Sequence, residues 1–375
     1  MEKIYTSLGL MSGTSMDGVD ASIIKSNGEN EYKSIFDEYF EYDEALYKDI
    51  VNLRSRINSV NDIIINSELI KDVERKITIF HGKICNKIIQ ENNHEIDLIG
   101  FHGQTIFHEA NQKISKQLGD GSLLSSLLKK DVIYNFRAND IINGGQGAPL
   151  APIFHNLMIN KKQIELPVYV LNIGGIANIT IITSNKNDDL ISYDIGPGNC
   201  LLDEWVRKHT NYRYDFSGRA ASIGKIDEII LNQAIENFEN IKKNNNLSFD
   251  IKDFDLSFVR GLTYENGLST LTKFTSEIIY QSISKITKSK QNENINILVC
   301  GGGRKNLTLI ENIKEKLPNN ISLNLIDNFN INGDFIESQA FAYLAIRSLL
   351  KKTISFPNTT NVKKSCTGGI LIKNY

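Results

Sequence analysis

Two glycine-containing turns in this sequence carry the residue types that bind the phosphates of a nucleotide. The first, Leu10–Gly18, reads LMSGTSMDG and combines glycine with hydroxyl side chains and one carboxylate. The second, Asn172–Asn178, reads NIGGIAN. Glycine permits unusual dihedrals and lets phosphate oxygens approach backbone N–H groups. Each turn alone is equally compatible with a plain tight hairpin, but together they favour a nucleotide-binding protein, with Asp17 as a ligand for Mg²⁺.

A third glycine segment follows an apolar run that is typical of a buried strand. Gly301, Gly302 and Gly303 would let an adenine base lie flat against the backbone, with Asn306 as a polar contact; the alternative is a simple strand-to-helix turn. The chain lacks the GxxxxGK[ST] pattern, and this run lacks GxGxxG spacing. A Walker-type kinase and a dinucleotide-binding dehydrogenase are therefore disfavoured.

One aspartate is placed where phosphoryl transfer needs a base. Transfer to an alcohol requires a carboxylate that takes a proton and orients the nucleophile. Asp194 ends an apolar strand-like run, and strand ends are where α/β proteins place such groups. The alternative is a cap for the helix expected near Leu201. We expect Gly196 and Asn199, which follow Asp194, to contact the substrate.

Polar, hydrogen-bonding side chains gather in Phe101–His108 (FHGQTIFH), which we expect to be a loop directly after a buried strand. The pattern is typical of a sugar-binding loop, so His102 and Gln104 are expected to contact a sugar, whereas His108 is expected to be structural. Arg137 precedes a glycine-rich segment and is expected to face a ligand; a buried ion pair is an equally good alternative.

Strand-like and helical segments alternate along the chain, which predicts α/β layers. Two strand–turn–strand units, each built around one of the phosphate turns, lie one domain apart and predict an internal duplication. Further strands are expected at 96–100, 131–136, 190–194, 295–300 and 368–372, and helices in two runs within 43–92 and at 149–158, 201–209, 262–286, near 307 and at 336–351.

The duplication predicts two similar domains that face one cleft. We expect residues 1–137 plus 352–375 to form the first domain, and 138–351 the second.

The bulk composition restricts the partners. The 375 residues include 42 Lys and Arg against 44 Asp and Glu, so no broad cationic surface is available for nucleic acid. The 4 cysteines lie far apart without a CxxC pair, as in reduced cytoplasmic proteins. Neither an export signal nor an apolar run of spanning length is recognisable. Small molecules are the expected partners, without nucleic acid or membrane, and a homodimer is left open.

Taken together, the motifs resemble those of the anhydro-N-acetylmuramic acid kinase family. The matching segments occur in the family's order and span nearly the whole chain: GLMSGTSMDGVD, GFHGQTIFH, QLGDGSLL, FRANDI with GGQGAPLAP, NIGGIANIT, DIGPGNCLLDEW, YDFSGRAASIG, CGGGRKN and GDFIESQAFAYLA. Three positions depart from the usual family pattern, namely Asn135, Ile195 and Ser217, and none of them carries chemistry assigned above.

This resemblance implies an actin-like fold, a duplicated ribonuclease H-like architecture. It implies an ATP- and Mg²⁺-dependent enzyme that opens a 1,6-anhydro cell-wall sugar with water and phosphorylates O6. Asp194 would be the general base on that water. The wider superfamily has a metal-binding Asp where this chain has Met11, so Asp17 and Glu337 become candidates for that role, and Glu337 joins Asp194 as a catalytic candidate. The nucleotide site implied by the turns and the resemblance comprises Ser12, Gly13, Thr14, Ser15, Met16, Asp17, Gly18, Val19, Asn172, Gly174, Gly175, Asn178, Gly301, Gly302, Gly303 and Asn306.

Two rival functions remain open at this level. One is an ordinary kinase of another sugar or polyol, which needs no catalytic water. The other is a nucleotide-gated binding protein, chaperone-like or filament-forming. The polar loops beside the turns have no obvious role in a switch that binds ATP alone, which argues against the second rival.

Overall fold

The computed structural model describes residues 3–92, 94–244, 248–290 and 292–374. The chain divides into two compact units. Unit 1 comprises Met1–Ile164, Asn185–Ile191 and Asp334–Tyr375, and unit 2 comprises Glu165–Ser184 and Ser192–Gly333. This division differs from the expected one, because residues 138–164, 185–191 and 334–351 belong to unit 1 rather than to the second domain.

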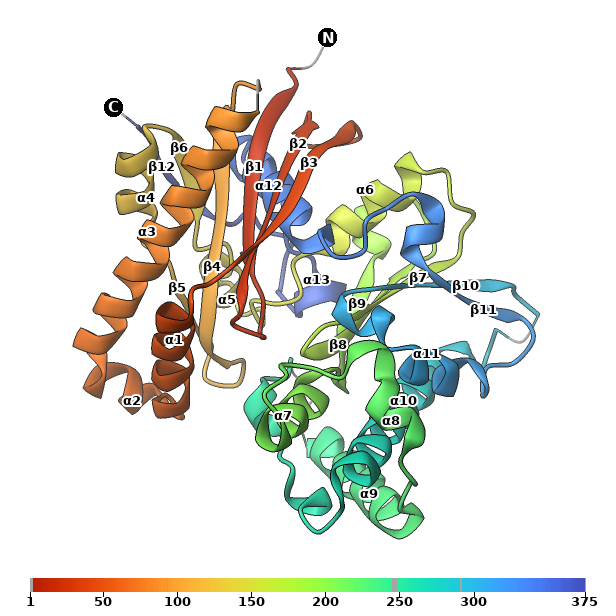
Figure 1. Ribbon diagram of the computed structural model, residues 1–375. Helices are drawn as coiled ribbons and strands as arrows, with labels where there is room; N and C mark the ends of the chain where they lie inside the picture. Colours follow the sequence, from red (N-terminus) through yellow and green to blue (C-terminus); the bar gives the residue numbers. More distant parts are fainter. Residues whose placement is uncertain (1–2, 93, 245–247, 291, 375) are drawn as a thin grey trace. The chain divides into compact units, whose positions relative to one another are not determined.

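Unit 1 is built on a mixed sheet with the order β12-β6-β4-β1-β2-β3, and β5 pairs with β4 (Figure 1). β1 and β2 form an antiparallel hairpin, and β1, β4 and β6 run parallel. The strands are β1 (Tyr5–Ser12), β2 (Gly18–Ser26), β3 (Tyr32–Glu41), β4 (Leu98–Glu109), β5 (Ile114–Leu118), β6 (Asp131–Tyr134) and β12 (Ile370–Ile372). The helices are α1 (Glu44–Arg56), α2 (Val60–Ile65), α3 (Ser67–Glu91), α4 (Gly121–Leu128), α5 (Ala138–Ile142), α6 (Pro152–Lys161), α12 (Ile336–Leu349) and α13 (Pro357–Thr360).

Unit 2 contains a sheet with the order β11-β10-β7-β8-β9. β7 and β8 form an antiparallel hairpin, and β7, β10 and β11 run parallel. The strands are β7 (Val168–Ile173), β8 (Ile176–Ile182), β9 (Ile191–Pro197), β10 (Ile295–Cys300) and β11 (Ile321–Leu325). The helices are α7 (Cys200–His209), α8 (Arg219–Ile223), α9 (Glu228–Asn244), α10 (Tyr264–Thr287) and α11 (Leu307–Lys314).

The two sheets repeat one topology. In each, an edge strand lies beside the second strand of the hairpin, and two strands parallel to the first strand extend the sheet on the other side. The order β3-β2-β1-β4-β6 thus corresponds to β9-β8-β7-β10-β11. The predicted internal duplication is confirmed, and the fold is the expected α/β, actin-like one.

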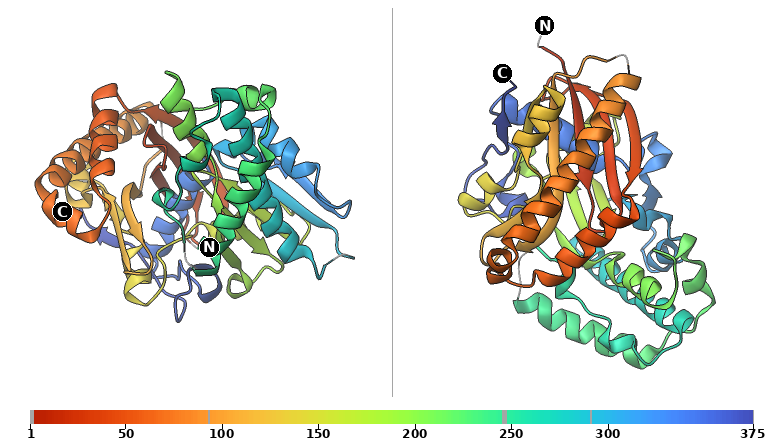
Figure 2. Two further views of the ribbon diagram at one scale, coloured as in Figure 1. Left: turned by 90° about the horizontal axis from the view of Figure 1, so that it is seen from below. Right: turned by 60° about the vertical axis from the view of Figure 1, so that its left-hand side comes forward.

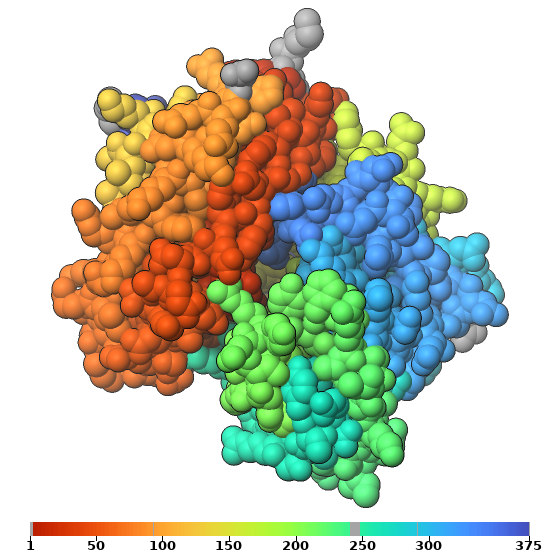
Figure 3. Space-filling model, viewed as in Figure 1, coloured from red at the N-terminus to blue at the C-terminus, as the bar shows by residue number. Residues whose placement is uncertain are grey.

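Helices cover both faces of the unit 1 sheet. Leu8 and Leu10 of β1 point into a core that they share with residues of α1 and α3. These two helices form part of the outer surface (Figures 2 and 3). Gly9 alternates to the opposite face, where a Cβ would overlap the backbone of Ser338 and Ala342 in α12. Gly100 on β4 faces Phe341 in the same way. These two glycines let α12 pack directly on the sheet, which explains why this late helix belongs to unit 1.

In the described part of the chain, every helix is too short or too polar to cross a bilayer.

Candidate active site

The first phosphate turn joins β1 to β2 in unit 1. Its conformation is closed by a hydrogen bond from Met16 N to Gly13 O at 3.2 Å. The backbone N–H groups of Thr14 and Ser15, at the exposed tip, have no hydrogen-bond partner among the described residues. A Cβ on Gly13 would meet only Ser15 Oγ, at 3.8 Å. The tip therefore offers backbone donors and open space to an anion.

The backbone of this turn differs from the expectation in one respect. The left-handed residue is Met16, with φ of 59°, whereas Gly13 does not adopt a positive φ. Gly13 thus provides close approach rather than an unusual dihedral. Two residues that were expected to contact the nucleotide are instead packed inside unit 1. Val19 is fully buried in the core, and Gly18 packs against Phe40 and Tyr39 of β3.

Gln104 lies directly beside the first turn. The segment Phe101–His108 belongs to β4, so the expectation of a loop was wrong. Gln104 pairs with Ser12 in the sheet, and its Nε2 atom donates to Gly13 O at 2.9 Å. Its Oε1 atom is buried and lacks a hydrogen-bond partner. The side chain thus braces the turn with one atom and presents an acceptor with the other.

His102 holds Arg137. The His102 Nδ1 atom lies 2.8 Å from Gly103 O, which can only accept, so Nδ1 carries the proton. Nε2 is then the acceptor, and Arg137 Nε and Nη2 donate to it at 3.2 and 3.1 Å. Burial, with the charge of Arg137, lowers the pKa of His102 to about 3, so the ring is neutral. Both ring nitrogen atoms of His102 are therefore hydrogen-bonded within the protein.

Asp140, three residues after Arg137, is fully buried. Its carboxylate accepts from Gly147 N at 2.6 Å and from the Thr360 hydroxyl group. Burial raises its pKa, against these hydrogen bonds. Asp140 therefore fixes the glycine-rich turn after α5.

Helix α12 directs its N-terminus toward the same end of unit 1. Ser338 in its first turn faces Gly9 and Ser22, whereas Ile346 near its other end faces Gly28 beyond β2. The helix thus runs antiparallel to β1, and Glu337, half-buried, lies at the end that is directed toward the phosphate turn. A helix N-terminus also stabilises negative charge. Asp17, in the turn itself, accepts from Ser15 Oγ at 2.5 Å.

In unit 2 the second phosphate turn lies against the loop after β9, although the two segments are more than 20 residues apart in the sequence. The second turn, Gly174–Gly175, accepts backbone hydrogen bonds from Gly198 N at 2.9 Å and Asn199 N at 2.8 Å. A Cβ on Gly198 would overlap Gly174 O, so this position requires glycine. Asn199 Nδ2 also donates to Ile173 O at 3.4 Å. The second turn and the loop after β9 thus form one interlocked structure.

The asparagines of the second turn extend this site across the hairpin. Asn172 and Asn178 are direct partners between β7 and β8. Asn172 also lies against Gly301, whose φ is 77° and where a Cβ would overlap Asn172 Oδ1. Gly302 has open space above it, because its nearest neighbour would be Asn199 Nδ2 at 3.7 Å. The residues expected to bind phosphate, base and substrate in unit 2 therefore converge.

Asp194 lies in the middle of β9 rather than at a strand end, and β9 is the edge strand of its sheet. It is half-buried, and its Oδ2 atom accepts from Phe249 N at 2.9 Å. The alternative of a helix cap is wrong, because the N-cap residue of α7 is Asn199. Gly196, two residues further along β9, is buried, and a Cβ there would crowd Phe238.

The third glycine segment is held by residues that sequence reasoning missed. Arg304, almost fully buried, donates from Nε and Nη2 to Asp327 at 2.7 and 3.0 Å, and from Nη1 to Gly301 O at 3.1 Å. Asn306 caps α11, since its Oδ1 atom accepts from Leu309 N at 3.0 Å. Arg304 adjoins the glycines and could have been inferred from that position, but Asp327 carries no comparable signal.

Comparison with known proteins assigns the chain to a family. The family model described as anhydro-N-acetylmuramic acid kinase matches residues 5–374. The chain is 67% identical to the protein of that name from Pelagibacter ubique (strain HTCC1062), over 100% of both chains. It is 37% identical to that from Zymomonas mobilis subsp. mobilis, over 96% of this chain and 98% of the relative. A solved ROK family glucokinase from Streptomyces griseus aligns with 90% of this chain and 98% of its own, at 11% identity and a TM-score of 0.40. By the family match and the two relatives, the chain belongs to the anhydro-N-acetylmuramic acid kinase family.

Proposed function

We propose that this protein is an ATP-dependent kinase that opens 1,6-anhydro-N-acetylmuramic acid and phosphorylates it at O6, in the recycling of cell-wall sugars. The observation that carries this proposal is family membership over residues 5–374, which includes every segment of the candidate site. The products are N-acetylmuramate 6-phosphate and ADP.

The reaction balances with one water. The water oxygen forms a bond to the anomeric carbon, C1, and the C1–O6 bond of the anhydro bridge breaks. The released O6 forms a bond to the γ-phosphorus of ATP, and ADP leaves. Asp194 takes a proton from the attacking water as general base. Its position supports this role, since Oδ2 is held by Phe249 N and the side chain is only half-buried.

The remaining roles follow the geometry of each unit. In unit 1 the tip of the first turn binds phosphate oxygens through its backbone N–H groups, while Gln104 and Arg137 contact the sugar. In unit 2 the Gly174–Gly175 turn binds phosphates, the Gly301–Gly303 segment lies against adenine, and Asn199 contacts substrate. Glu337 is the second catalytic carboxylate. The open space above Gly13 and Gly302 supports the ligand contacts proposed at those two positions.

Mg²⁺ is expected to bind together with ATP, and the Asp17 carboxylate in the first turn is a suitable ligand for it. Mg²⁺ in kinases is held by one or two carboxylates together with phosphate oxygens and waters. Asp17 supplies a carboxylate whose Oδ2 atom has no partner among the described residues. Within those residues, no group of three or more His, Cys, Asp or Glu side chains could hold a metal alone. The ion would neutralise phosphate charge.

We place the reaction in the cytoplasm, which the four free cysteines support. The direct test of the function is ADP release measured with purified protein, ATP and Mg²⁺, with and without the anhydro sugar. Release that depends strictly on 1,6-anhydro-N-acetylmuramic acid is expected. Equal release with other sugars or polyols would favour an ordinary sugar kinase, and release without any sugar would favour a nucleotide-gated binding protein.

A further inference from the structure

A buried hydrogen-bond network lies beneath the first phosphate turn. Ser12, the last residue of β1, is almost fully buried, and its Oγ atom lies 2.9 Å from Tyr42 Oη and 3.2 Å from His81 Nε2. Tyr42 directly precedes the N-cap of α1, and His81 lies on α3. Both side chains are buried, so water does not compete for these contacts.

The proton positions in this network can be assigned. His81 Nδ1 lies 2.8 Å from Ile77 O, which can only accept, so Nδ1 carries a proton. Burial lowers the pKa of His81 to about 4, which leaves the ring neutral and Nε2 an acceptor. The Ser12 hydroxyl therefore donates to His81, and the Tyr42 hydroxyl donates to Ser12. The single proton of Ser12 is committed inside the protein.

Tyr42 also holds the other end of the turn. Its backbone N–H donates to Asp17 O at 2.9 Å, while its phenol contacts Ser12. One residue thus fixes both the entry and the exit of Gly13–Met16. Gln104 adds a third contact, at Gly13 O.

We propose that Tyr42 and His81 are positioning residues for nucleotide binding, and that Ser12 is the internal anchor through which they act rather than a phosphate ligand. The proposal rests on the proposed function of the first turn. Preorganised N–H groups bind an anion without an ordering cost. Loss of the anchor lets the turn adopt other conformations, so ATP affinity falls while the sugar site is unchanged.

The test is a set of conservative variants assayed by steady-state kinetics. Tyr42→Phe removes only the hydroxyl group, and His81→Asn removes the acceptor that faces Ser12. Each should raise the KM for ATP about three- to tenfold, the range expected for one buried hydrogen bond, with the KM for the sugar unchanged. His81→Gln, whose amide can reach Ser12, should restore part of the ATP affinity.

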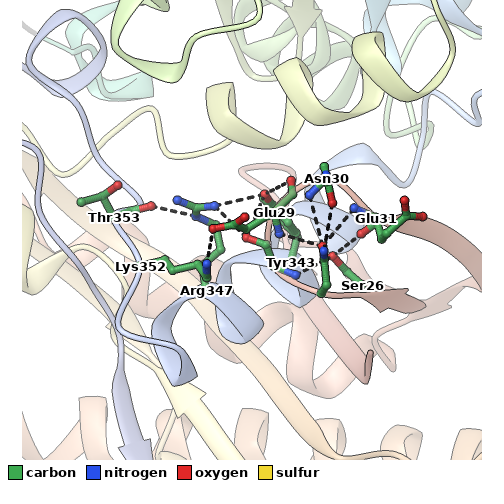
Figure 4. Close-up of polar contacts among 10 residues, drawn as sticks. Ser26, Glu29, Asn30, Glu31, Tyr343, Arg347, Lys352 and Thr353 are labelled. Carbon is green, nitrogen blue, oxygen red and sulfur yellow. Dashed lines mark hydrogen bonds and ion pairs between the residues drawn. The ribbon is translucent and has the colours of Figure 1, made fainter. Parts of the chain in front are cut away.

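Tyr343→Phe is the matched control. Tyr343 is a buried tyrosine of α12. Its hydroxyl donates at 2.9 Å to the backbone oxygen of Glu29, in the loop between β2 and β3 and away from the first phosphate turn, within a network that includes Arg347 (Figure 4). Its loss should lower the melting temperature about as much as Tyr42→Phe does, without changing the KM for ATP. An ATP KM that rises equally in both variants would indicate general destabilisation and overturn the proposal.

A double-mutant cycle separates anchor from ligand. If Ser12 is an anchor, Ser12→Ala should weaken ATP binding in the wild type but add little in Tyr42→Phe. Full additivity would mean that Ser12 contacts phosphate directly, and an unchanged ATP affinity in both Tyr42→Phe and His81→Asn would also refute the proposal. ATP affinity can also be measured as the binding of an ATP analogue without sugar. This measurement tests the anchor even if the protein shows no sugar-dependent turnover, so a failure of the proposed function is distinguished from a failure of this proposal.

Discussion

The guanidinium group of Arg137 donates to His102 Nε2 from two nitrogen atoms, at 3.2 and 3.1 Å. The other ring nitrogen of His102, Nδ1, donates to Gly103 O, and the ring packs against Phe341 at a tilt of 40° with centroids 4.4 Å apart. His102 is therefore a neutral acceptor locked in one orientation, and its orientation determines where Arg137 points.

Removing this acceptor should affect the sugar more than the nucleotide. We predict that His102→Leu lowers kcat/KM for the anhydro sugar by roughly tenfold, because a charge-assisted hydrogen bond to Arg137 is lost, while the KM for ATP changes little. The measurement is steady-state kinetics with each substrate varied. His209→Gln is the control, since His209 is exposed at the C-terminal end of α7, where its ring packs on Trp205 and its Nδ1 atom lies 2.9 Å from Trp205 O, so it should not affect either KM. A normal kcat/KM in His102→Leu would show that Arg137 does not depend on His102.

Gly13→Ala should separate nucleotide affinity from stability. The fold has room for the methyl group, since the nearest atom is 3.8 Å away, and Gly13 does not need a positive φ. The melting temperature should therefore stay within about 1 °C of the wild type, while the phosphate is pushed away and ATP affinity falls. Binding of an ATP analogue and thermal unfolding measure the two effects.

Gly261→Ala is the matched control for that substitution, because a Cβ built on Gly261 would have no neighbour within 4 Å among the described residues. It should change neither stability nor ATP affinity. If Gly13→Ala also leaves ATP affinity unchanged, the first turn is an ordinary hairpin.

Acidification should destabilise unit 1 before its carboxylates titrate. Burial lowers the pKa of four of its histidines from 6.5, to about 4 for His81 and His155 and to about 3 for His102 and His108. Between pH 6.5 and 5 the unfolded chain binds protons at these positions and the folded chain does not, so the free energy of unfolding falls as pH falls.

The slope is at most about 1.4 kcal/mol per pH unit for each histidine. Asp37 and Asp140 act in the opposite direction, because burial raises the pKa of both carboxyl groups, so the net slope is smaller. Urea unfolding followed from pH 7 to pH 5 measures this dependence. A flat profile would contradict the neutral burial of these rings.

The sequence predicted the two hairpins because each contains a turn signature between apolar strands, and it predicted the duplication from their spacing. The prediction of a loop at Phe101–His108 was wrong, because the polar residues of this segment were taken to indicate exposure to solvent. In the structure, Gln104 and His102 are buried within β4, where Gly13 O and Arg137 partner them. Such partners come from distant segments, and nothing local in the sequence identifies them.

The placement of α12 could not be predicted for a related reason. Its packing depends on Gly9 and Gly100, which lie more than 230 residues before the helix and permit its backbone to approach two strands. The Tyr42–Ser12–His81 network likewise combines β1 and α3 with the residue that precedes the N-cap of α1. Sequence patterns predict each element, whereas the contacts between elements decide which residues support the site.

Asp194→Asn should lower turnover by roughly 10² to 10⁴ while ATP affinity changes little. The amide has nearly the same shape and can still accept from Phe249 N, but it cannot take a proton from water. Single-turnover rates and binding of an ATP analogue measure the two quantities. Near-normal turnover would exclude Asp194 as the base.

The route of solvent oxygen tests the reaction itself. An ordinary kinase phosphorylates an existing hydroxyl group and adds no water to the sugar, whereas the anhydro bridge has no free O6. In ¹⁸O-labelled water we therefore expect one label at C1 of the product and none in the transferred phosphate, whose oxygens come from ATP and from O6. The C1 hydroxyl of a free sugar exchanges with solvent, so early time points are compared with preformed product incubated alongside. Label in the phosphate would indicate ATP hydrolysis, and an unlabelled sugar would exclude attack by water and favour a simple kinase.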